Sequence, residues 1–512
     1  MTTGRLRLHD VVAQHARSRT AALAIGDGEV RLDWRSHHDR VERCARALGA
    51  AGVGAGDRVL WLGQNSFRVQ ELLIACSRLG AMLCPANWRQ SVDELAFVID
   101  DLAPTVIVTQ TAEVGDTVSD ALDAARHRAA LVVAHDVDDA YERWLADAPD
   151  APAPDPAMPD DPVLLIGTAA FDGQPNFAML PHRAIIAQAL LMGPLMGVTD
   201  ASRYLNAGPL FHIGVFMENF ATLVAGGANI FVRRVDGHDL CRAINDFACT
   251  SGYVMGPMIE GVAVANRDGR YDLSSMRGRR GNEIYDGWVR PDTSPWGVQP
   301  GGYGQTETMG MQTFNALAPR DVIGSHGRVS PLVELRVVDP NDDEVPVGET
   351  GEMVVRGTTV MCGYWNRPEL NARRSRGGWH HTNDLGRYEA DGSLTFVGPK
   401  GRMLKSAAEN IYPIEVEQAL RSHPAVADAA IIGIPDEVWV QSVKAVVMLR
   451  DGAAATADEL IAHCRARIAS YKKPRTVEFV DALPRTGFAI DYDALDARFG
   501  GGNYPGAGTR SA

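Results

Sequence analysis

Three features are missing from this sequence of 512 residues. The seven cysteines include no CxxC pair and are widely scattered, which is typical of reduced thiols rather than a disulfide framework or a structural zinc site. No segment is apolar over the roughly 20 residues that a membrane-spanning helix needs. The first residues also lack the apolar core of a signal peptide. These absences predict a cytoplasmic protein without a membrane span.

An excess of positive charge is also missing. The formal net charge is −14, with 64 acidic residues against 50 lysines and arginines. Proteins that bind nucleic acids or anionic membranes usually carry stripes of lysine and arginine, so neither is expected as the main partner. A nucleotide is not excluded, because it needs only a local pocket of hydrogen-bond donors.

The chain is too long for one hydrophobic core, since cores stop growing near roughly 250–300 residues. Strand and helix patterns alternate near the start, with strand Arg58–Leu62, helix Phe67–Leu79 and buried strand Met82–Pro85. This alternation predicts a parallel sheet covered by helices. Short strands such as Val333–Val338 follow, and after residue 402 the pattern becomes a compact α+β module.

We therefore expect an α/β fold. It has a large N-terminal domain of doubly wound sheets plus a β-rich subdomain, and a small mobile C-terminal α+β domain. The expected units are an N-terminal domain over residues 1–397, a hinge over 398–402, a C-terminal domain over 403–499 and a disordered tail over 500–512.

The segment Gly302–Glu307 reads GYGQTE. A glycine-rich turn exposes backbone N–H groups, Thr306 offers a hydroxyl and Glu307 offers a hard oxygen, so together they could hold a phosphate and a magnesium ion. Taken alone, the segment is equally compatible with an ordinary polar loop.

A second segment, residues 378–411, reads GWHHTNDLGRYEADGSLTFVGPKGRMLKSAAENI. Asp384 lies between short strands, where a carboxylate can accept hydrogen bonds from two ribose hydroxyls. The letters EADG before SLTFVG indicate a hairpin. By itself Asp384 could equally be a turn or cap residue.

The two segments, in this order and spacing, resemble the adenylate-forming superfamily of acyl-CoA synthetases, peptide-synthetase adenylation domains and luciferases. GYGQTE is similar to its Tyr-Gly-x-Thr-Glu motif and HTNDLGR to its Thr-Gly-Asp-Leu-Gly motif. Further similar segments, over nearly the whole chain, are GAGDRVLWLGQNS, LGAMLCPANWR, PLFH, ENIYPIEVE, IPDEVW, YKKPRTVEFV and LPRT.

The resemblance implies an acid–thiol ligase. A carboxylic acid reacts with Mg-ATP to give an acyl-adenylate, and a thiol, either coenzyme A or a carrier-protein arm, then takes the acyl group. ATP or AMP, Mg²⁺ and coenzyme A are the implied ligands, and a homodimer is possible. The implied site residues are Thr306 and Gly304 at the phosphate, Glu307 at the metal, Tyr303 at the adenine, Asp384 at the ribose, Thr168 in the phosphate loop, His212 beside the acyl or pantetheine group and Lys405 in the thioester step.

Two parts of the family pattern are altered. The family's phosphate loop reads roughly Thr-Ser-Gly-Thr-Thr-Gly-x-Pro-Lys-Gly, whereas this chain has TAAFDGQPNF from Thr168, with Asp172, Asn176 and Phe177 in place of threonine, lysine and glycine. Ala489 lies at or beside the position of the family's catalytic lysine. Loss of one preorganised donor of this kind typically costs ~10²–10³ in rate.

Three hypotheses follow. The chain is a working acyl-CoA synthetase-like enzyme whose ATP-driven step is impaired. It is a non-catalytic homologue that binds a nucleotide, an acyl-CoA or a partner protein. Or it is a repurposed enzyme that uses the pocket for another condensation or for the thioester half-reaction alone. Nucleotide binding and pyrophosphate release separate them.

Overall fold

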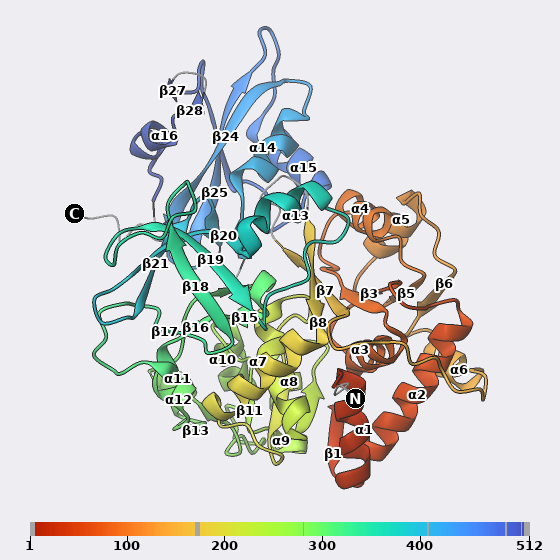
Figure 1. Cartoon of the computed structure of the whole chain (residues 1–512). Helices are drawn as coiled ribbons and strands as arrows, with labels where there is room; N and C mark the ends of the chain where they lie inside the picture. Colours follow the sequence, from red (N-terminus) through yellow and green to blue (C-terminus); the bar gives the residue numbers. More distant parts are fainter. Residues whose placement is uncertain are drawn as a thin grey trace.

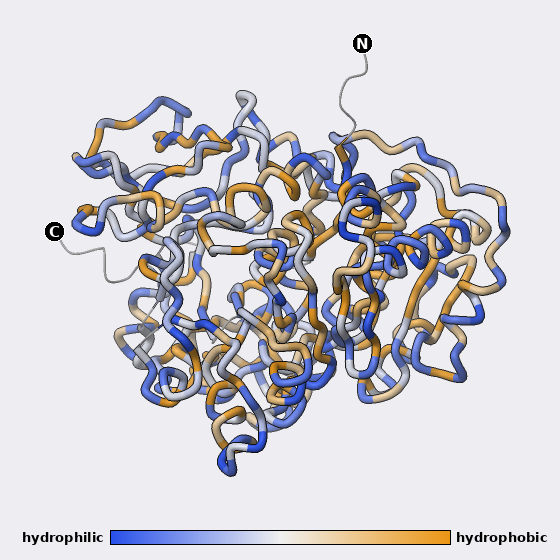
Figure 2. The backbone as a smooth tube through the Cα atoms, turned by 90° about the horizontal axis from the view of Figure 1, so that it is seen from below, coloured by the Kyte–Doolittle hydropathy of each residue, from blue (hydrophilic) through white to orange (hydrophobic). Residues whose placement is uncertain are grey.

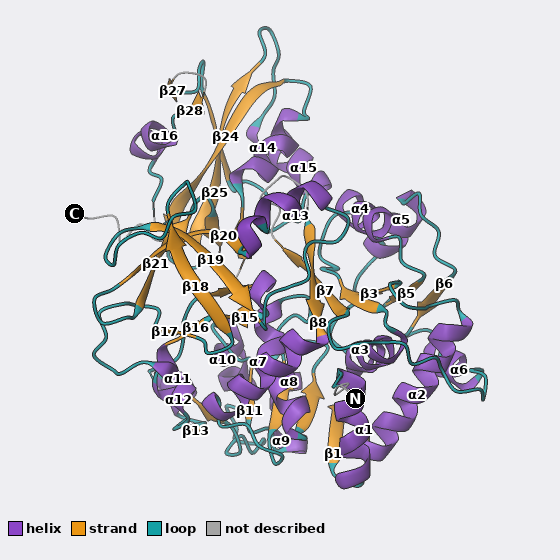
Figure 3. Ribbon diagram, in the orientation of Figure 1, coloured by secondary structure: helices purple, strands orange, loops and turns teal. Residues whose placement is uncertain are grey.

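Two mainly parallel sheets, one antiparallel sheet and a C-terminal α+β module make up the fold (Figures 1 and 3). The computed structural model describes residues 6–168, 175–279, 281–406, 409–486, 489–502 and 504–505. Residues 169–174, which hold most of the predicted phosphate loop, therefore lie outside the described residues.

The first sheet has six strands. They run parallel except the last, which returns antiparallel to its neighbour. In spatial order the strands are β6 (Leu131–Ala134), β5 (Val106–Thr109), β3 (Arg58–Leu62), β4 (Met82–Pro85), β7 (Pro162–Thr168) and β8 (Asn176–Pro181).

The second sheet has five strands and is parallel apart from one antiparallel edge strand. In spatial order the strands are β11 (Ser251–Gly252), β9 (Arg203–Asn206), β10 (Ala228–Phe231), β1 (Leu23–Asp27) and β2 (Val30–Asp33). In both sheets the chain places strands on both sides of the first strand, as expected of doubly wound sheets.

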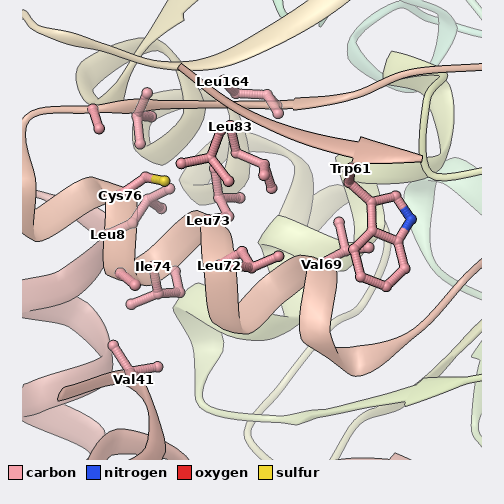
Figure 4. Close-up of a cluster of buried hydrophobic side chains, with 14 of the residues drawn as sticks. Leu8, Val41, Trp61, Val69, Leu72, Leu73, Ile74, Cys76, Leu83 and Leu164 are labelled. Atoms are coloured by element: carbon pink, nitrogen blue, oxygen red, sulfur yellow. The ribbon is translucent and has the colours of Figure 1, made fainter. Parts of the chain in front are cut away.

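Helix α3 (Phe67–Leu79) contacts strands of both sheets. It begins at Ser66, whose hydroxyl caps the helix, and ends at Gly80, which adopts a left-handed conformation (φ 71°). Eleven of its 13 residues are buried. Figure 4 shows Leu72 and Leu73 from this helix beside Leu83 and Leu164 of the six-stranded sheet. Because α3 is buried on almost every side, it lies between two sheets rather than at the surface.

The other helices cover the outer faces of the sheets and connect their strands. They are α1 (Leu8–Ser18), α2 (Trp34–Ala50), α4 (Val92–Leu102), α5 (Thr117–Ala124), α6 (Ala140–Ala146), α7 (His182–Leu195), α8 (Ile213–Ala225), α9 (Gly237–Phe247), α10 (Pro257–Ala265), α11 (Glu283–Asp286) and α12 (Pro295–Val298).

The β-rich subdomain is an antiparallel four-stranded sheet. Its strands are β18 (Val333–Val338), β19 (Gly351–Gly357), β20 (His380–Tyr388) and β21 (Leu394–Pro399), with helix α13 (Pro368–Arg374) between β19 and β20. Strands β20 and β21 form the hairpin that EADG indicated.

The C-terminal module has its own sheet, so no sheet runs through from the β-rich subdomain. Its strands are β22 (Leu404–Ser406), β23 (Glu409–Ile411), β24 (Val426–Asp436), β25 (Val440–Leu449) and β26 (Thr476–Phe479), and its helices are α14 (Pro413–Arg421), α15 (Ala457–Arg467) and α16 (Tyr492–Phe499). The change of sheet falls between Pro399 and Leu404. The α/β fold with a large N-terminal and a small C-terminal part is thereby confirmed; that the small part moves about this segment remains a prediction.

The expected tail begins with residues that contact the C-terminal module. The Tyr504 hydroxyl accepts a hydrogen bond from the Gly433 amide (2.8 Å) and donates one to Asp496 (2.8 Å). Among the described residues, no helix is long and apolar enough to cross a membrane. Hydrophobic and hydrophilic segments alternate along the backbone in Figure 2.

Candidate active site

The GYGQTE segment forms a tight hairpin. It contains β14 (Gly304–Gln305) and a 3-10 turn (Thr306–Thr308), followed by β15 (Gly310–Met311). A Cβ at Gly302, whose φ is 151°, would overlap the carbonyl oxygen of Thr313. Glycine is therefore required for the close approach of the two strands, and that approach fixes where Thr306 and Glu307 lie.

A cavity of about 580 Å³ lies between this hairpin, strand β20 and the C-terminal module. This volume lies within the roughly 300–1,000 Å³ of small-molecule sites. A second cavity, of about 170 Å³, shares Thr168 and Thr306 with it and is lined by His212. The larger cavity is lined by the predicted site residues Thr168, Tyr303, Gly304, Thr306, Glu307, Asp384 and Lys405. All eight residues singled out in the sequence therefore meet around two adjoining cavities.

Tyr303 and Asp384 contact each other directly. The Tyr303 hydroxyl donates to the Asp384 carboxylate at 2.6 Å, and the Tyr303 ring stacks on Phe396 at 5.2 Å between centroids. Burial raises the pKa of Asp384 to about 7. One aromatic wall and one carboxylate thus lie side by side, which suits a ring and a diol of one ligand.

Glu307 is buried, with only 6% of its surface exposed. Burial raises the pKa of its carboxyl group, and the hydroxyl of Tyr364 opposes this shift by donating to it at 2.7 Å. Thr306 and Glu307 together offer hard oxygen donors to the cavity.

The C-terminal module supplies the opposite wall. The Lys405 ammonium group donates to Asn410 at 2.8 Å, and burial lowers its pKa. Glu409 lies 3.4 Å from the His212 imidazole and accepts from Arg89 at 2.8 Å. Burial opposes ionisation of Glu409, but the hydrogen bonds and charges of His212 and Arg89 outweigh this effect and lower its pKa. His212 thus joins the two parts of the chain.

Buried charges also fix the orientation of the module. The ammonium group of Lys472, 6% exposed, donates to Glu94 of helix α4 at 2.9 Å and also contacts Glu415 of helix α14. Nearby, the hydroxyl of Ser91 donates to the carbonyl of Arg467 at 2.9 Å. In this orientation Lys405 faces the cavity. Strands β27 (Arg485–Thr486) and β28 (Ala489–Ile490) lie at the far end of the module, well away from β15 and β20 (Figure 1).

The strand after the phosphate loop shows what replaces the family's lysine. Asn176, 3% exposed, accepts from the guanidinium of Arg367 at 3.0 Å, and Arg367 is itself paired with Asp101 at 2.8 Å. Phe177 lies in strand β8 with extended backbone, so a bulky side chain causes no conflict with a left-handed conformation there. The hydroxyl of Thr168 is buried without a hydrogen-bond partner among the described residues.

Sequence reasoning missed Tyr364, Arg367 and the role of Lys472. Lys472 belongs to the YKKPRTVEFV segment that carried part of the resemblance. The sequence of that segment does not predict which residues Lys472 contacts. Tyr364 and Arg367 lie in an irregular segment before α13 with no periodic signal.

Comparison with known proteins assigns the chain to a family. Residues 9–365 match the model of the AMP-binding enzyme family, and residues 415–488 match its C-terminal domain. The chain is 36% identical over 482 residues to a feruloyl-CoA synthase from Amycolatopsis sp, covering 93% of this chain and 95% of that protein. It is 33% identical over 494 residues to an indoleacetate–CoA ligase from Aromatoleum aromaticum, covering 94% and 96%.

Among solved structures, an o-succinylbenzoate CoA synthetase double mutant from Bacillus subtilis superimposes with a TM-score of 0.79 at 23% identity, covering 96% of this chain and 98% of that one. This last likeness supports the fold only. The family matches and the two relatives confirm the resemblance seen in the sequence: the chain belongs to the AMP-binding enzyme family and is an acyl-CoA synthetase-like ligase.

Proposed function

We propose that this protein joins a small aromatic carboxylic acid to the thiol of coenzyme A, and that its ATP-driven first step is slow. The observation that carries the proposal is the cavity in which Tyr303, Thr306, Glu307 and Asp384 face Lys405 of the C-terminal module. The aromatic substrate class is supported by the names of the two relatives, a feruloyl-CoA synthase and an indoleacetate–CoA ligase.

In the first step, a carboxylate oxygen of the acid attacks the α-phosphorus of ATP, and the bond to pyrophosphate breaks. Asp384 would accept the ribose hydroxyls and Tyr303 would form the wall beside the adenine. Thr306 would donate its hydroxyl to the α-phosphate. A bound nucleotide must compete with the Tyr303–Asp384 hydrogen bond of 2.6 Å.

The donors at the site fit a magnesium ion, which prefers oxygen ligands. Glu307 would hold the ion, with Thr306 beside it. Bound there, Mg²⁺ would neutralise phosphate charge, and the protein's part is to hold the Glu307 carboxylate in a direction that faces the phosphates.

In the second step, the thiol sulfur attacks the acyl carbon, the bond to the AMP oxygen breaks and AMP leaves. Lys405 would stabilise charge at the phosphate as AMP departs, since its ammonium group lines the cavity. His212 and Glu409 would line the path of the thiol, because they meet where the two parts of the chain join. A carrier-protein arm is the other possible acceptor.

The slow first step is inferred from the loss of two lysines of the family pattern, at Asn176 and Ala489. The chain has only five lysines, and the first of them is Lys400. No lysine of the large domain can therefore replace the one lost at Asn176, and Ala489 has no ammonium group. Arg367, the cation beside Asn176, is already neutralised by Asp101. The orientation with Lys405 at the cavity favours a second candidate, an enzyme that performs only the thioester half-reaction.

Two assays on the full chain test these proposals. Pyrophosphate release from Mg-ATP with a panel of aromatic, short, medium and long acids measures the first step. Transfer from a synthetic aryl-adenylate to coenzyme A measures the second. We expect acyl-CoA from the adenylate and little pyrophosphate from ATP. If neither assay gives product with any acid, the ligase proposal fails and the non-catalytic alternative gains support.

A further inference from the structure

Tyr364 makes a hydrogen bond to Glu307 that the family resemblance did not predict. Its hydroxyl donates to Oε1 of Glu307 at 2.7 Å, and both side chains are buried, with 1% and 6% of their surfaces exposed. This hydrogen bond ties residue 364 to the GYGQTE hairpin.

The backbone around Tyr364 is held on both sides. Its amide donates to the side-chain oxygen of Asn371 at 2.7 Å, and the side-chain nitrogen of Asn371 donates back to the Tyr364 carbonyl at 2.8 Å. This reciprocal pair fixes the position of residue 364 relative to helix α13. The Tyr364 hydroxyl therefore contacts Glu307 from a backbone position that is held by hydrogen bonds.

Residues 361–365, here called the strap, join two parts of the site. Met361 donates its amide to the carbonyl of Glu307 at 2.9 Å. Cys362 and Trp365 donate theirs to the carbonyls of Met179 and Phe177 in strand β8, both at 2.8 Å. Strand β8 follows the phosphate loop directly, so the strap sets the distance between that loop's strand and the Glu307 carboxylate.

A carboxylate that binds a metal needs a fixed direction. Tyr364 supplies this direction to Glu307, because it engages one oxygen and restricts rotation of the group. The other oxygen, Oε2, is not engaged by Tyr364.

We infer that Tyr364 is a positioning residue that holds the Glu307 carboxylate ready for the divalent cation of a metal–nucleotide complex, through the strap that also holds strand β8. This inference rests on the proposed function. It goes beyond that proposal by assigning a role to a residue that does not touch the substrate.

The test replaces Tyr364 by phenylalanine, which removes the hydroxyl and keeps the ring. The readout is the affinity for Mn²⁺ in the presence of a non-hydrolysable ATP analogue, measured by electron paramagnetic resonance on the full chain. We expect about 10–100-fold weaker Mn²⁺ binding, the usual effect of losing a hydrogen bond to a metal ligand. The matched control is Tyr388→Phe, which removes a hydroxyl that donates to the Leu335 carbonyl at 2.9 Å in the β-rich subdomain; its Mn²⁺ affinity should be unchanged.

A double-mutant cycle separates positioning from general damage. In a Glu307→Gln background, Tyr364→Phe should weaken Mn²⁺ binding no further, because the group that it orients is already altered. Additive losses would overturn the inference, and so would wild-type Mn²⁺ affinity in a folded Tyr364→Phe protein. If Tyr364→Phe does not fold, Asn371→Ala keeps the hydroxyl but frees the backbone of residue 364; it should weaken Mn²⁺ binding in the same direction, and unchanged affinity overturns the inference.

Because the readout is metal binding, its failure differs from failure of the proposed function. Weaker Mn²⁺ binding in Tyr364→Phe, together with no acyl-CoA from any acid, supports the positioning role and rejects the ligase. If the unmodified protein binds no Mn²⁺–nucleotide complex, the positioning role is rejected, whatever the acyl transfer assay shows.

Discussion

Lys472 donates to Glu94 at 2.9 Å across 378 positions of sequence, and this buried contact ties the C-terminal module to helix α4. Glu415, on the module itself, is the second carboxylate at the same ammonium group. Burial opposes the charge on Lys472, but Glu415 and Glu94 raise its pKa well above the usual value. The module cannot rotate away from this orientation without separating Lys472 from Glu94.

We therefore expect Lys472→Met to release the module. Removing one partner of a buried ion pair leaves the others uncompensated, which typically costs about 3–5 kcal/mol. Here Glu94 and Glu415 would face each other unpaired. Fluorescence energy transfer between dyes on the two parts of the chain should report a broader range of distances. Lys473→Met is the matched control, since the Lys473 ammonium group donates hydrogen bonds only to Ser470 among the described residues. An unchanged distance distribution in Lys472→Met would show that the contact does not hold the module.

Val440 lines the larger cavity with φ at 69°, a left-handed conformation that β-branched residues rarely adopt. Such strain costs on the order of 1–3 kcal/mol, and glycine relieves it at an entropic cost of about 1 kcal/mol or less. Val440→Gly should therefore leave stability unchanged or raise it by about 1–2 kcal/mol, and it should lower the KM for coenzyme A by widening the cavity. Denaturant unfolding and steady-state kinetics check both effects. Val438→Gly, at an exposed site outside the left-handed region, should give no gain in stability.

Asp384 predicts a pH dependence. Its pKa in the folded protein, about 7, lies above the usual 3.8 because of burial. The folded state therefore binds the proton more tightly than the unfolded state, and the stability linked to it is present below pH 3.8 and lost as the pH rises through 7. Asp384→Asn removes this loss while leaving an oxygen for the Tyr303 hydroxyl. We expect the gain in unfolding free energy from Asp384→Asn to be larger at pH 8 than at pH 5, by on the order of 2 kcal/mol.

Thermal unfolding at the two pH values, with the exposed Asp451→Asn as control, measures this difference. Equal effects of Asp384→Asn at pH 5 and pH 8 would mean that Asp384 keeps an ordinary pKa. The burial of this carboxylate would then not oppose its charge.

Local sequence signals were sufficient for much of the fold. Strand β3 (Arg58–Leu62), helix α3 and strand β18 have the bounds that hydrophobic periodicity predicted. The motif residues Glu307 and Asp384 also line one cavity, and their roles there remain a prediction. Periodicity and motifs report on neighbours in sequence, so they suffice for elements and for residues that a glycine-rich turn or a hairpin fixes.

Contacts between distant segments could not be read in the same way. The partners of Lys472 and Tyr364 lie 378 and 57 positions away, and nothing local selects them. The sign of φ at Val440 depends on how strand β25 leaves the turn before it. The pairing of Asn176 with Arg367 depends on where the strap crosses strand β8. Each of these is a product of tertiary packing.

That pairing changes what repair of the phosphate loop requires. Lysine at position 176 would place a second cation against the Arg367 guanidinium, which lies 3.0 Å from the Asn176 oxygen in a buried site. We expect Asn176→Lys to lower the unfolding free energy by about 3–5 kcal/mol, as for other uncompensated buried charges. Asn176→Met, of similar length and without charge, is the control and should cost clearly less in denaturant unfolding. Equal costs for the two variants would mean that the lysine escapes to solvent.

The last prediction concerns adenylation itself. Pyrophosphate release by the unmodified protein should be well below the order of 1 s⁻¹ that is ordinary for enzymes. Ala489→Lys alone should restore little of the rate. The new lysine would stabilise the reacting carboxylate and α-phosphate, but the altered loop would still not stabilise the leaving pyrophosphate. Groups that act on one transition state are not additive. Combining Ala489→Lys with Asp172→Thr, Asn176→Lys and Phe177→Gly should therefore recover more than the sum of the separate repairs.

The comparison requires that thermal unfolding first show the combined variant to be folded. Two results would contradict this prediction. If Ala489→Lys alone restores ordinary rates, the phosphate loop is functional as it stands. If the unmodified protein already releases pyrophosphate at such rates, the chain is a ligase with an unconventional phosphate site.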